Sequence, residues 1–138
     1  MPLLNSIIVY IMKNRQKRIH KFIDEPLKTQ ERTLEHLIQK ASATEFGIKY
    51  GFNKIKSYDD FKKKIPLQSY EDFFPWIERN LKGEQNLLRP TKINWFAKSS
   101  GTTNDKSKYI PVSKEALFNC HYRAGKDILS FHCKEFPN

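Results

Sequence analysis

Apolar residues recur at helical spacing along the first part of the chain. Between about residues 3 and 23 they stand at positions 3, 4, 7, 8, 11, 19, 22 and 23, which favours one amphipathic helix. The run Ile7–Met12 is too short for a membrane span of about 20 apolar residues. Basic residues follow this run, whereas a secretory signal has them before its apolar part. We therefore interpret the run as the buried face of a helix packed on its own protein.

A second amphipathic helix is predicted from Pro26 to about Ala43, because Asp24 can cap it and proline suits a first helical turn. Its apolar stripe consists of Leu27, Leu34, Leu37, Ile38 and Ala41. Two glycines between residues 44 and 53 predict a loop there.

Two nearly identical pentapeptides, twelve residues apart, predict the starts of two short helices. They are Ser57-Tyr58-Asp59-Asp60-Phe61 and Ser69-Tyr70-Glu71-Asp72-Phe73. In each, a serine followed three residues later by an aspartate resembles a capping box, in which each side chain bonds the backbone of the other residue. Pro75 is expected to bend or restart the second helix, and Gly83 to end it.

After Pro90 the pattern changes to residues that favour strands. The segment Ile93–Ala97 is rich in aromatic and β-branched residues and predicts a strand. Residues 109–112 predict a second short strand, which Pro111 would place at an edge or an end of a sheet.

A long helix is expected to follow, capped by Ser113 and running from Lys114 to about Phe131. Its apolar stripe consists of Leu117, Cys120, Ala124, Ile128 and Phe131. The predicted fold class is α/β, with N-terminal helices followed by a strand–loop–strand–helix unit. Such a unit is an incomplete core, because one or two strands do not form a stable sheet alone.

Composition and charge limit the possible partners. With 138 residues, 38% of them hydrophobic and 13% aromatic, the chain is typical of a globular domain. A net charge of +10 favours anionic partners, which include nucleic acid, acidic membranes and phosphate compounds. The two cysteines, Cys120 and Cys133, do not make a disulfide framework and suit a reducing cytosol, so we expect a cytoplasmic protein.

The segment Ser99–Lys108 carries the strongest functional signal. Four hydroxyl side chains lie within five residues, and Gly101 has no Cβ, so phosphate oxygens can approach the backbone amides. Lys106 and Lys108 add positive charge, and the segment follows a predicted strand, where ligand loops of α/β sheets lie. These features favour polyphosphate binding, although an ordinary polar hairpin loop would have a similar composition. The segment is not a P-loop, because Asp105 precedes Lys106 where that motif requires glycine and the spacing is one residue short.

The loop also resembles a known motif. Ser99-Ser100-Gly101-Thr102-Thr103, followed by Lys108 and Pro111, resembles the first ATP-binding motif of the Gretchen Hagen family of acyl acid–amido synthetases, which belong to the adenylate-forming superfamily. Further similar stretches are Thr44-Glu45-Phe46-Gly47, Ile65-Pro66-Leu67, Tyr70-Glu71-Asp72, Gly83-Glu84 and Ile110-Pro111-Val112-Ser113. The resemblance therefore extends from about residue 25 onward. One departure is Asp105, where many members have glycine.

The resemblance implies that residues 1–138 are part of a large N-terminal domain, with the C-terminal domain absent. Residues 1–90 would be a mainly helical segment and residues 91–138 the nucleotide-loop segment. In the whole enzyme, a small carboxylic acid is adenylated by ATP with Mg²⁺ and then joined to an amine or amino acid. The residues implied in nucleotide binding are Ser99, Ser100, Gly101, Thr102, Thr103 and Lys108. No catalytic base is identified, and the chain is expected to be too short to be active alone.

The helix after the loop helps to line the acyl-acid pocket in this family, and here it carries Phe118, Tyr122 and Arg123. Packing of the two rings and exposure of the arginine are the alternative. The pairs Cys120-His121 and His132-Cys133 lack the spacing of zinc ligands, so no metal site is predicted.

The alternative function is a basic, non-enzymatic binding module for nucleic acid or another polyanion. Basic charge is interleaved with aromatic residues in Lys49-Tyr50, Lys56-Ser57-Tyr58 and Trp95-Phe96-Ala97-Lys98, which can suit nucleic acid. No helix-turn-helix, zinc-finger or RNA-recognition signature accompanies them, so nucleic acid is the less favoured partner. No membrane partner is expected either.

Overall fold

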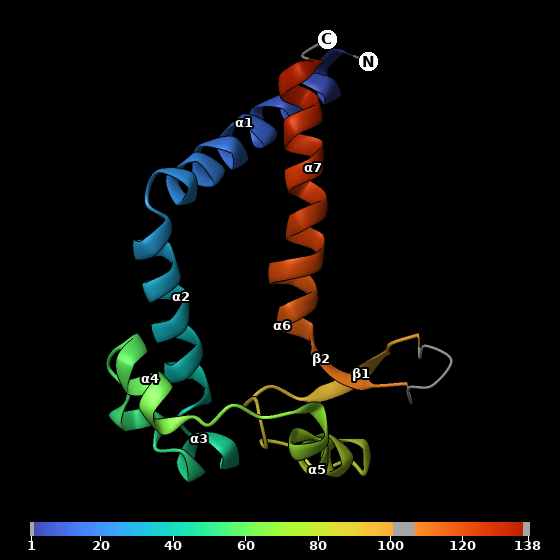
Figure 1. Ribbon diagram of the computed structural model, residues 1–138. Coiled ribbons are helices and arrows are strands. Elements are labelled where there is room, and N and C mark those ends of the chain that lie inside the picture. The colour runs from blue at the N-terminus through green and yellow to red at the C-terminus, as the bar shows by residue number, and fades with distance from the viewer. Residues whose placement is uncertain (1, 101–106, 137–138) are drawn as a thin grey trace. The chain divides into compact units, whose positions relative to one another are not determined.

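The computed structural model of the protein describes residues 2–100 and 107–136. Within these ranges the chain forms helices and one two-stranded antiparallel sheet (Figure 1). It divides into two compact units, of which unit 1 comprises Met1–Gln30 and Ala116–Asn138 and unit 2 comprises Glu31–Glu115. The predicted helix-rich N-terminal part, followed by strand–loop–strand–helix, is confirmed.

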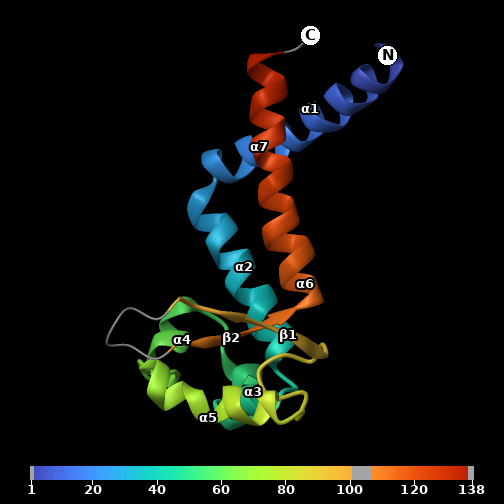
Figure 2. The same ribbon diagram turned by 90° about the vertical axis from the view of Figure 1, so that its right-hand side faces the viewer.

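Unit 1 is built from two long helices, α1 (Pro2–Asp24) and α7 (Tyr122–Glu135), which lie against each other (Figure 2). Ile19 of α1 is buried, and several polar contacts also join the two helices. The fully buried Ser130 of α7 donates its hydroxyl to the carbonyl of Met12 at 3.1 Å, and Gln16 donates its amide to the Ser130 carbonyl at 2.6 Å. Arg15 forms a two-pronged ion pair with Asp127.

The expectation that the run Ile7–Met12 forms a buried face is wrong. Ile7 and Ile11 are 54% and 53% exposed, because the helix contact uses a different face of α1. The predicted stripe of the last helix is likewise exposed at Ile128 and Phe131.

The last helix also differs from the expected single element. It begins at Lys114 as predicted, but α6 (Lys114–Ala116) is followed by a π-helical segment, Leu117–His121, before α7 continues to Glu135. A π-helical turn holds about one residue more than an α-helical turn, so a stripe counted at 3.6 residues per turn does not stay on one face beyond it.

Unit 2 contains most of α2 (Pro26–Ala41) and four further short helical elements. They are α3 (Glu45–Lys49), the 3₁₀ turn η1 (Phe52–Lys54), α4 (Tyr58–Lys64) and α5 (Tyr70–Leu81). Its core is a cluster of the buried Ile38, Phe52 and Ile55. Partly buried apolar residues surround this cluster, namely Leu34, Ala41, Phe46, Tyr50, Phe61 and Ile65.

The loop predicted over residues 44–53 is wrong, because α3 and η1 occupy most of it. Thr44 caps α3: its hydroxyl accepts the Gly47 N–H at 3.0 Å and donates to the Ala41 carbonyl at 2.6 Å. Gly47 lies inside this helix, where an added Cβ would stand 1.9 Å from the Ala41 oxygen. Gly51 has φ +63°, the left-handed conformation that favours glycine. The glycines therefore permit close packing and a turn between short helices.

Both predicted serine caps are confirmed. The Ser57 hydroxyl accepts the Asp60 N–H, and Ser69 with Asp72 forms a complete capping box at the start of α5. Gly83 ends α5 as predicted, with φ +98°. The helix does not restart at Pro75, one of the two outcomes expected there, since α5 is one element. Proline removes a single backbone hydrogen bond there, and the caps at both ends stabilise the helix.

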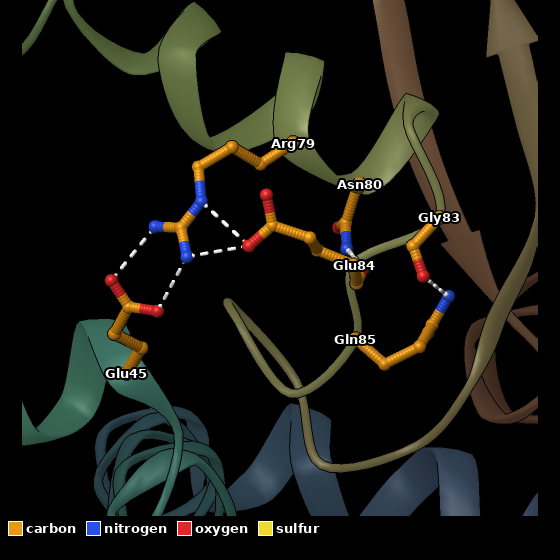
Figure 3. A network of polar contacts seen from close by, with 6 residues as sticks. All are labelled: Glu45, Arg79, Asn80, Gly83, Glu84 and Gln85. Carbon is orange, nitrogen blue, oxygen red and sulfur yellow. Dashed lines mark hydrogen bonds and ion pairs between the residues drawn. The ribbon is translucent and has the colours of Figure 1, made fainter.

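An ion network connects α3 with the end of α5 (Figure 3). The Arg79 guanidinium donates to both carboxylate oxygens of Glu45 at 2.7 and 2.8 Å, and to Glu84 at 2.9 and 2.7 Å. These bonds raise the pKa of the Arg79 guanidinium. The bonds from Arg79 also lower the pKa of the Glu45 carboxyl. The backbone of α3 is also tied to the following loop, because Phe46 donates its N–H to the Leu87 carbonyl at 2.9 Å.

The sheet consists of β1 (Ile93–Lys98) and β2 (Tyr109–Ser113), which confirms both predicted strands. They pair antiparallel, with Lys98 opposite Tyr109 and an irregularity between Ile93 and Trp95. Gln85 holds the start of β1, since its side-chain oxygen accepts the Ile93 N–H at 2.8 Å. The two strands bring the ends of the loop between them together.

Candidate functional site

The neck of the β1–β2 hairpin is closed by Ser99 and Lys108. The Ser99 N–H donates to the Lys108 carbonyl at 3.0 Å, and the Lys108 N–H donates to the Ser99 Oγ at 2.9 Å. Ser99 and Ser100 are exposed, whereas Lys108 is half-buried. The neck therefore places the Ser99 hydroxyl next to the backbone of Lys108, the residue that precedes β2.

Three of the six residues predicted to bind a nucleotide are thus described: Ser99, Ser100 and Lys108. The other three, Gly101, Thr102 and Thr103, lie outside the described residues, as does Asp105. The pairing of the strands brings Ser99 and Lys108 together, nine positions apart in the chain.

A further residue at the neck was not predicted from the sequence. Tyr70, the first residue of α5, accepts the Tyr109 N–H on its hydroxyl at 2.8 Å and donates to the Tyr109 carbonyl at 3.3 Å. Its ring centroid lies 5.4 Å from the Lys108 Nζ. The sequence marks Tyr70 as a helix start and as part of a stretch similar to the family, but it does not reveal the partner, since a hydrogen bond to a residue 39 positions away leaves no local pattern.

The positive charges at the neck lie beside aromatic rings. Lys108 is held over Tyr70, and the Lys98 Nζ lies 5.9 Å from the Tyr109 ring centroid. A cation above a ring is attracted by the negative face of the ring, which limits where the ammonium can go. Hydroxyl groups and ammonium groups together suit the oxygens of a phosphate.

The described residues contain no cluster of the side chains that commonly bind metal ions. Among residues 2–100 and 107–136, no three His, Cys, Asp or Glu side chains gather closely enough to hold a metal ion. Cys120 and Cys133 are both free thiols, and Cys120 is exposed. The described part of the neck thus offers hydroxyl and ammonium groups and contains no cluster of His, Cys, Asp or Glu side chains.

Unit 1 has a separate surface hollow between α1 and the segment after the hairpin. Its apolar part includes Ile11 and Phe118, and its basic part includes Arg18, Arg123 and Lys126. Two of the three residues singled out on this helix, Phe118 and Arg123, therefore line the hollow. Tyr122 is 57% exposed, with its ring centroid 5.2 Å from that of Phe118.

Comparison with known proteins places the chain in a family. The model of the GH3 family N-terminal domain matches residues 15–137, which include the hairpin and the whole of α5. The chain belongs to the GH3 family. This confirms the resemblance noted from the Ser99–Thr103 motif, since the Gretchen Hagen synthetases are the same family.

Similar curated proteins include plant synthetases. A jasmonoyl–L-amino acid synthetase, JAR6 of Nicotiana attenuata, is 30% identical over 128 residues, which cover 90% of this chain and 22% of that protein. An indole-3-acetic acid-amido synthetase, GH3.2 of Arabidopsis thaliana, is 29% identical over 121 residues, covering 84% of the chain and 22% of that protein. The GH3 chain thus spans about a fifth of the length of these relatives.

The fold is also that of a solved member of the family. The structure of the AtGH3.15 acyl acid amido synthetase in complex with 2,4-DB matches 97% of this chain and 22% of its own, with a TM-score of 0.69 at 22% identity. A second structure, of the GH3.15 acyl acid amido synthetase, matches 92% of this chain with the same TM-score. In the part of the GH3 chain that the structure describes, no helix is both long and apolar enough to cross a membrane.

Proposed function

We propose that this GH3 chain is the nucleotide-binding N-terminal part of an ATP-dependent acyl acid–amido synthetase. The observation that carries the proposal is the family match across the hairpin, together with the neck that sets Ser99 beside Lys108. Family membership favours a synthetase over a basic binding module, because curated relatives such as JAR6 and GH3.2 are themselves synthetases.

The reaction we propose for the whole enzyme has two steps. An oxygen of a small carboxylic acid attacks the α-phosphorus of ATP, the bond to the β-phosphate breaks, and pyrophosphate leaves. The nitrogen of an amine or amino acid then attacks the acyl carbon, AMP leaves with the electrons of the C–O bond, and the nitrogen loses a proton. Both steps depend on positioning and on neutralising phosphate charge.

Within this reaction, the hairpin would hold the phosphates. The hydroxyls from Ser99 to Thr103 and the backbone amides from Ser100 to Thr103 would donate hydrogen bonds, whereas the Ser99 N–H already bonds the Lys108 carbonyl. Lys108 would supply positive charge. Mg²⁺, when bound with ATP, would neutralise part of the phosphate charge, as it does in phosphoryl transfer generally. We assign no residue of this chain to the metal and none to proton removal.

The first test is ATP binding by the purified chain, measured by titration calorimetry with Mg²⁺ present. We expect Thr102→Ala to weaken ATP binding about fivefold by removing one hydrogen bond. Gly101→Val should weaken it about tenfold or more, because its side chain would stand where a phosphate must approach. Thr91→Ala, an exposed threonine outside the hairpin, is the matched control and should bind as the original chain does.

The alternative polyanion module predicts a different result. A single-stranded DNA oligonucleotide would then bind, with an affinity that falls steeply with salt and ignores Thr102→Ala. DNA binding of this kind, combined with no ATP binding by the original chain, would refute the nucleotide proposal.

We further propose that the chain does not catalyse the reaction alone, since it spans about a fifth of the length of its synthetase relatives. An ATP–pyrophosphate exchange assay with a panel of small carboxylic acids should therefore show no turnover. Exchange by the isolated chain would overturn this part of the proposal. A cytoplasmic location belongs to the same proposal, because the two free thiols suit a reducing compartment.

A further inference from the structure

We propose that Tyr70 is a positioning residue that holds the hairpin neck, and the Lys108 ammonium with it, in the arrangement that receives phosphate. This inference rests on the proposed function and names a residue through which the nucleotide hairpin is held. Tyr70 is not in the loop and need not touch the nucleotide. It acts through Tyr109 and Lys108.

The hydroxyl of Tyr70 makes the hydrogen bonds that a neighbouring strand would otherwise make to the backbone of Tyr109. Lys108 uses its backbone N–H and carbonyl on the side facing β1, where it bonds Ser99. Since backbone groups of successive residues in a strand point to opposite sides, those of Tyr109 face away from β1. The Tyr70 hydroxyl accepts from the Tyr109 N–H and donates to its carbonyl, so it satisfies both groups at the open edge of β2.

The ring of Tyr70 acts on the side chain of the preceding residue. The Lys108 Nζ lies 5.4 Å from the centroid of this ring. The attraction between the ammonium and the ring limits the positions that the ammonium can take at the neck. One side chain therefore fixes both the backbone at Tyr109 and the charge at Lys108. Simple packing of an aromatic ring would need neither of the two hydrogen bonds to the hydroxyl.

Tyr70 is itself held on a well-fixed element. It directly follows Ser69, whose capping box with Asp72 orders the first turn of α5. The far end of the same helix is tied to α3 by the bonds from Arg79 to Glu45 (Figure 3). A helix fixed at both ends can transmit its position to the hairpin, which a flexible support could not do.

The repeated pentapeptide supplies a matched control. Tyr58 occupies the same place after Ser57 that Tyr70 occupies after Ser69, but it is 61% exposed. Its ring lies near Lys62 of its own helix, with the Nζ 4.8 Å from the centroid. Tyr58→Phe therefore makes the same chemical change in the same local sequence, away from the hairpin.

The experiment compares Tyr70→Phe with Tyr58→Phe in the full 138-residue chain. Hydrogen exchange should become faster at the Tyr109 amide in Tyr70→Phe, because the hydroxyl that accepts its proton is gone. ATP binding should weaken about three- to tenfold in the same variant. Tyr58→Phe should change neither quantity.

A double-mutant cycle separates positioning from general stability. If Tyr70 acts through the Lys108 ammonium, Tyr70→Phe should weaken ATP binding much less in a chain that already carries Lys108→Met, because that change has removed the charge. A merely structural effect of Tyr70→Phe would be the same with and without Lys108→Met. Equal ATP affinity of Tyr70→Phe and the original chain would overturn the inference, as would independent effects of the two changes.

Failure of the proposed function gives a different pattern. If the original chain binds no ATP, the nucleotide proposal is wrong, and hydrogen exchange alone then decides whether Tyr70 holds the neck. Unchanged protection of the Tyr109 amide in Tyr70→Phe would refute the inference in that case as well.

Discussion

Gly47 and Gly51 stand four residues apart, and glycine is favoured at each position for a different physical reason. Gly51 has a positive φ of 63°, which side chains with a Cβ rarely adopt. Gly47 has an ordinary helical place in α3, but the Ala41 carbonyl leaves no room for a Cβ. That carbonyl also accepts the hydroxyl of Thr44, so the end of α2 and the start of α3 are packed at one point.

Gly47→Ala should therefore destabilise unit 2 by about 2 kcal/mol or more, since backbone must move to admit the methyl group. Urea unfolding followed by tryptophan fluorescence measures this, because Trp76 and Trp95 both lie in unit 2. Gly125→Ala in α7 is the control: nothing lies within 4 Å of the added carbon, and alanine should favour the helix by about 0.5–1 kcal/mol. An unchanged unfolding midpoint for Gly47→Ala would contradict the packing argument.

At the scale of elements, short helices in unit 2 are held by their ends. α5 has a complete capping box at one end and a left-handed glycine at the other, and Arg79 joins its last turn to Glu45 of α3. The carboxylates in these contacts have lowered pKa values: that of Glu45 through its bonds to Arg79, and that of Asp72 through its bonds to Ser69. Charge on these groups therefore favours the folded state.

Acid should weaken these contacts in a definite direction. A carboxylate whose pKa is lower in the folded than in the unfolded chain contributes stability above its ordinary pKa, which is 4.5 for Glu45, and loses it as pH falls through the folded value. The urea concentration at the midpoint of unfolding, followed by tryptophan fluorescence, should therefore stay constant from neutral pH down to about pH 5.5 and then fall.

Glu45→Gln should reduce this dependence on pH, since the uncharged amide cannot gain from ionisation. Glu71→Gln removes an exposed carboxylate from the same region and serves as the control. The two variants are compared by thermal unfolding at a series of pH values. An acid-induced fall of the same size in Glu45→Gln and in the original chain would count against the Arg79–Glu45 pair as a source of stability.

At the scale of the molecule, unit 1 exposes much apolar surface. Polar contacts of Ser130, Gln16 and the Arg15–Asp127 pair join its two main helices, and many of its large apolar side chains are exposed. Those at least 40% exposed are Ile7, Ile8, Tyr10, Ile11, Phe22, Ile23, Leu27, Phe118, Tyr122, Ile128, Leu129, Phe131 and Phe136. Apolar surface of this extent is typical of an interaction face.

We expect this surface to bind a hydrophobic dye such as ANS, whose fluorescence rises when it contacts exposed apolar groups. The double substitution Ile7→Lys with Ile11→Lys should lower the dye signal while leaving the tryptophan-monitored unfolding of unit 2 unchanged. Asn14→Lys, which adds charge at an exposed polar position of the same helix, should leave the dye signal nearly as it was. A dye signal that does not depend on Ile7 and Ile11 would contradict this account.

Features decided by a few neighbouring residues could be predicted from the sequence. The serine caps at 57 and 69, the glycine stop at 83 and the two strands follow from local backbone chemistry, and the family from a short hydroxyl-rich motif. The nucleotide-binding role of that motif stays a prediction, and three of its residues lie outside the described ranges.

Tertiary structure decided what depends on distant partners. Periodicity showed that α1 has an apolar face but not that its contact with α7 would leave that face exposed. The need for glycine at 47 comes from a carbonyl six residues earlier, and Arg79 meets Glu45 across 34 residues. Tyr70 forms hydrogen bonds with Tyr109, which lies 39 positions further along the chain. Such contacts form when elements pack, and a single sequence carries no periodic trace of them.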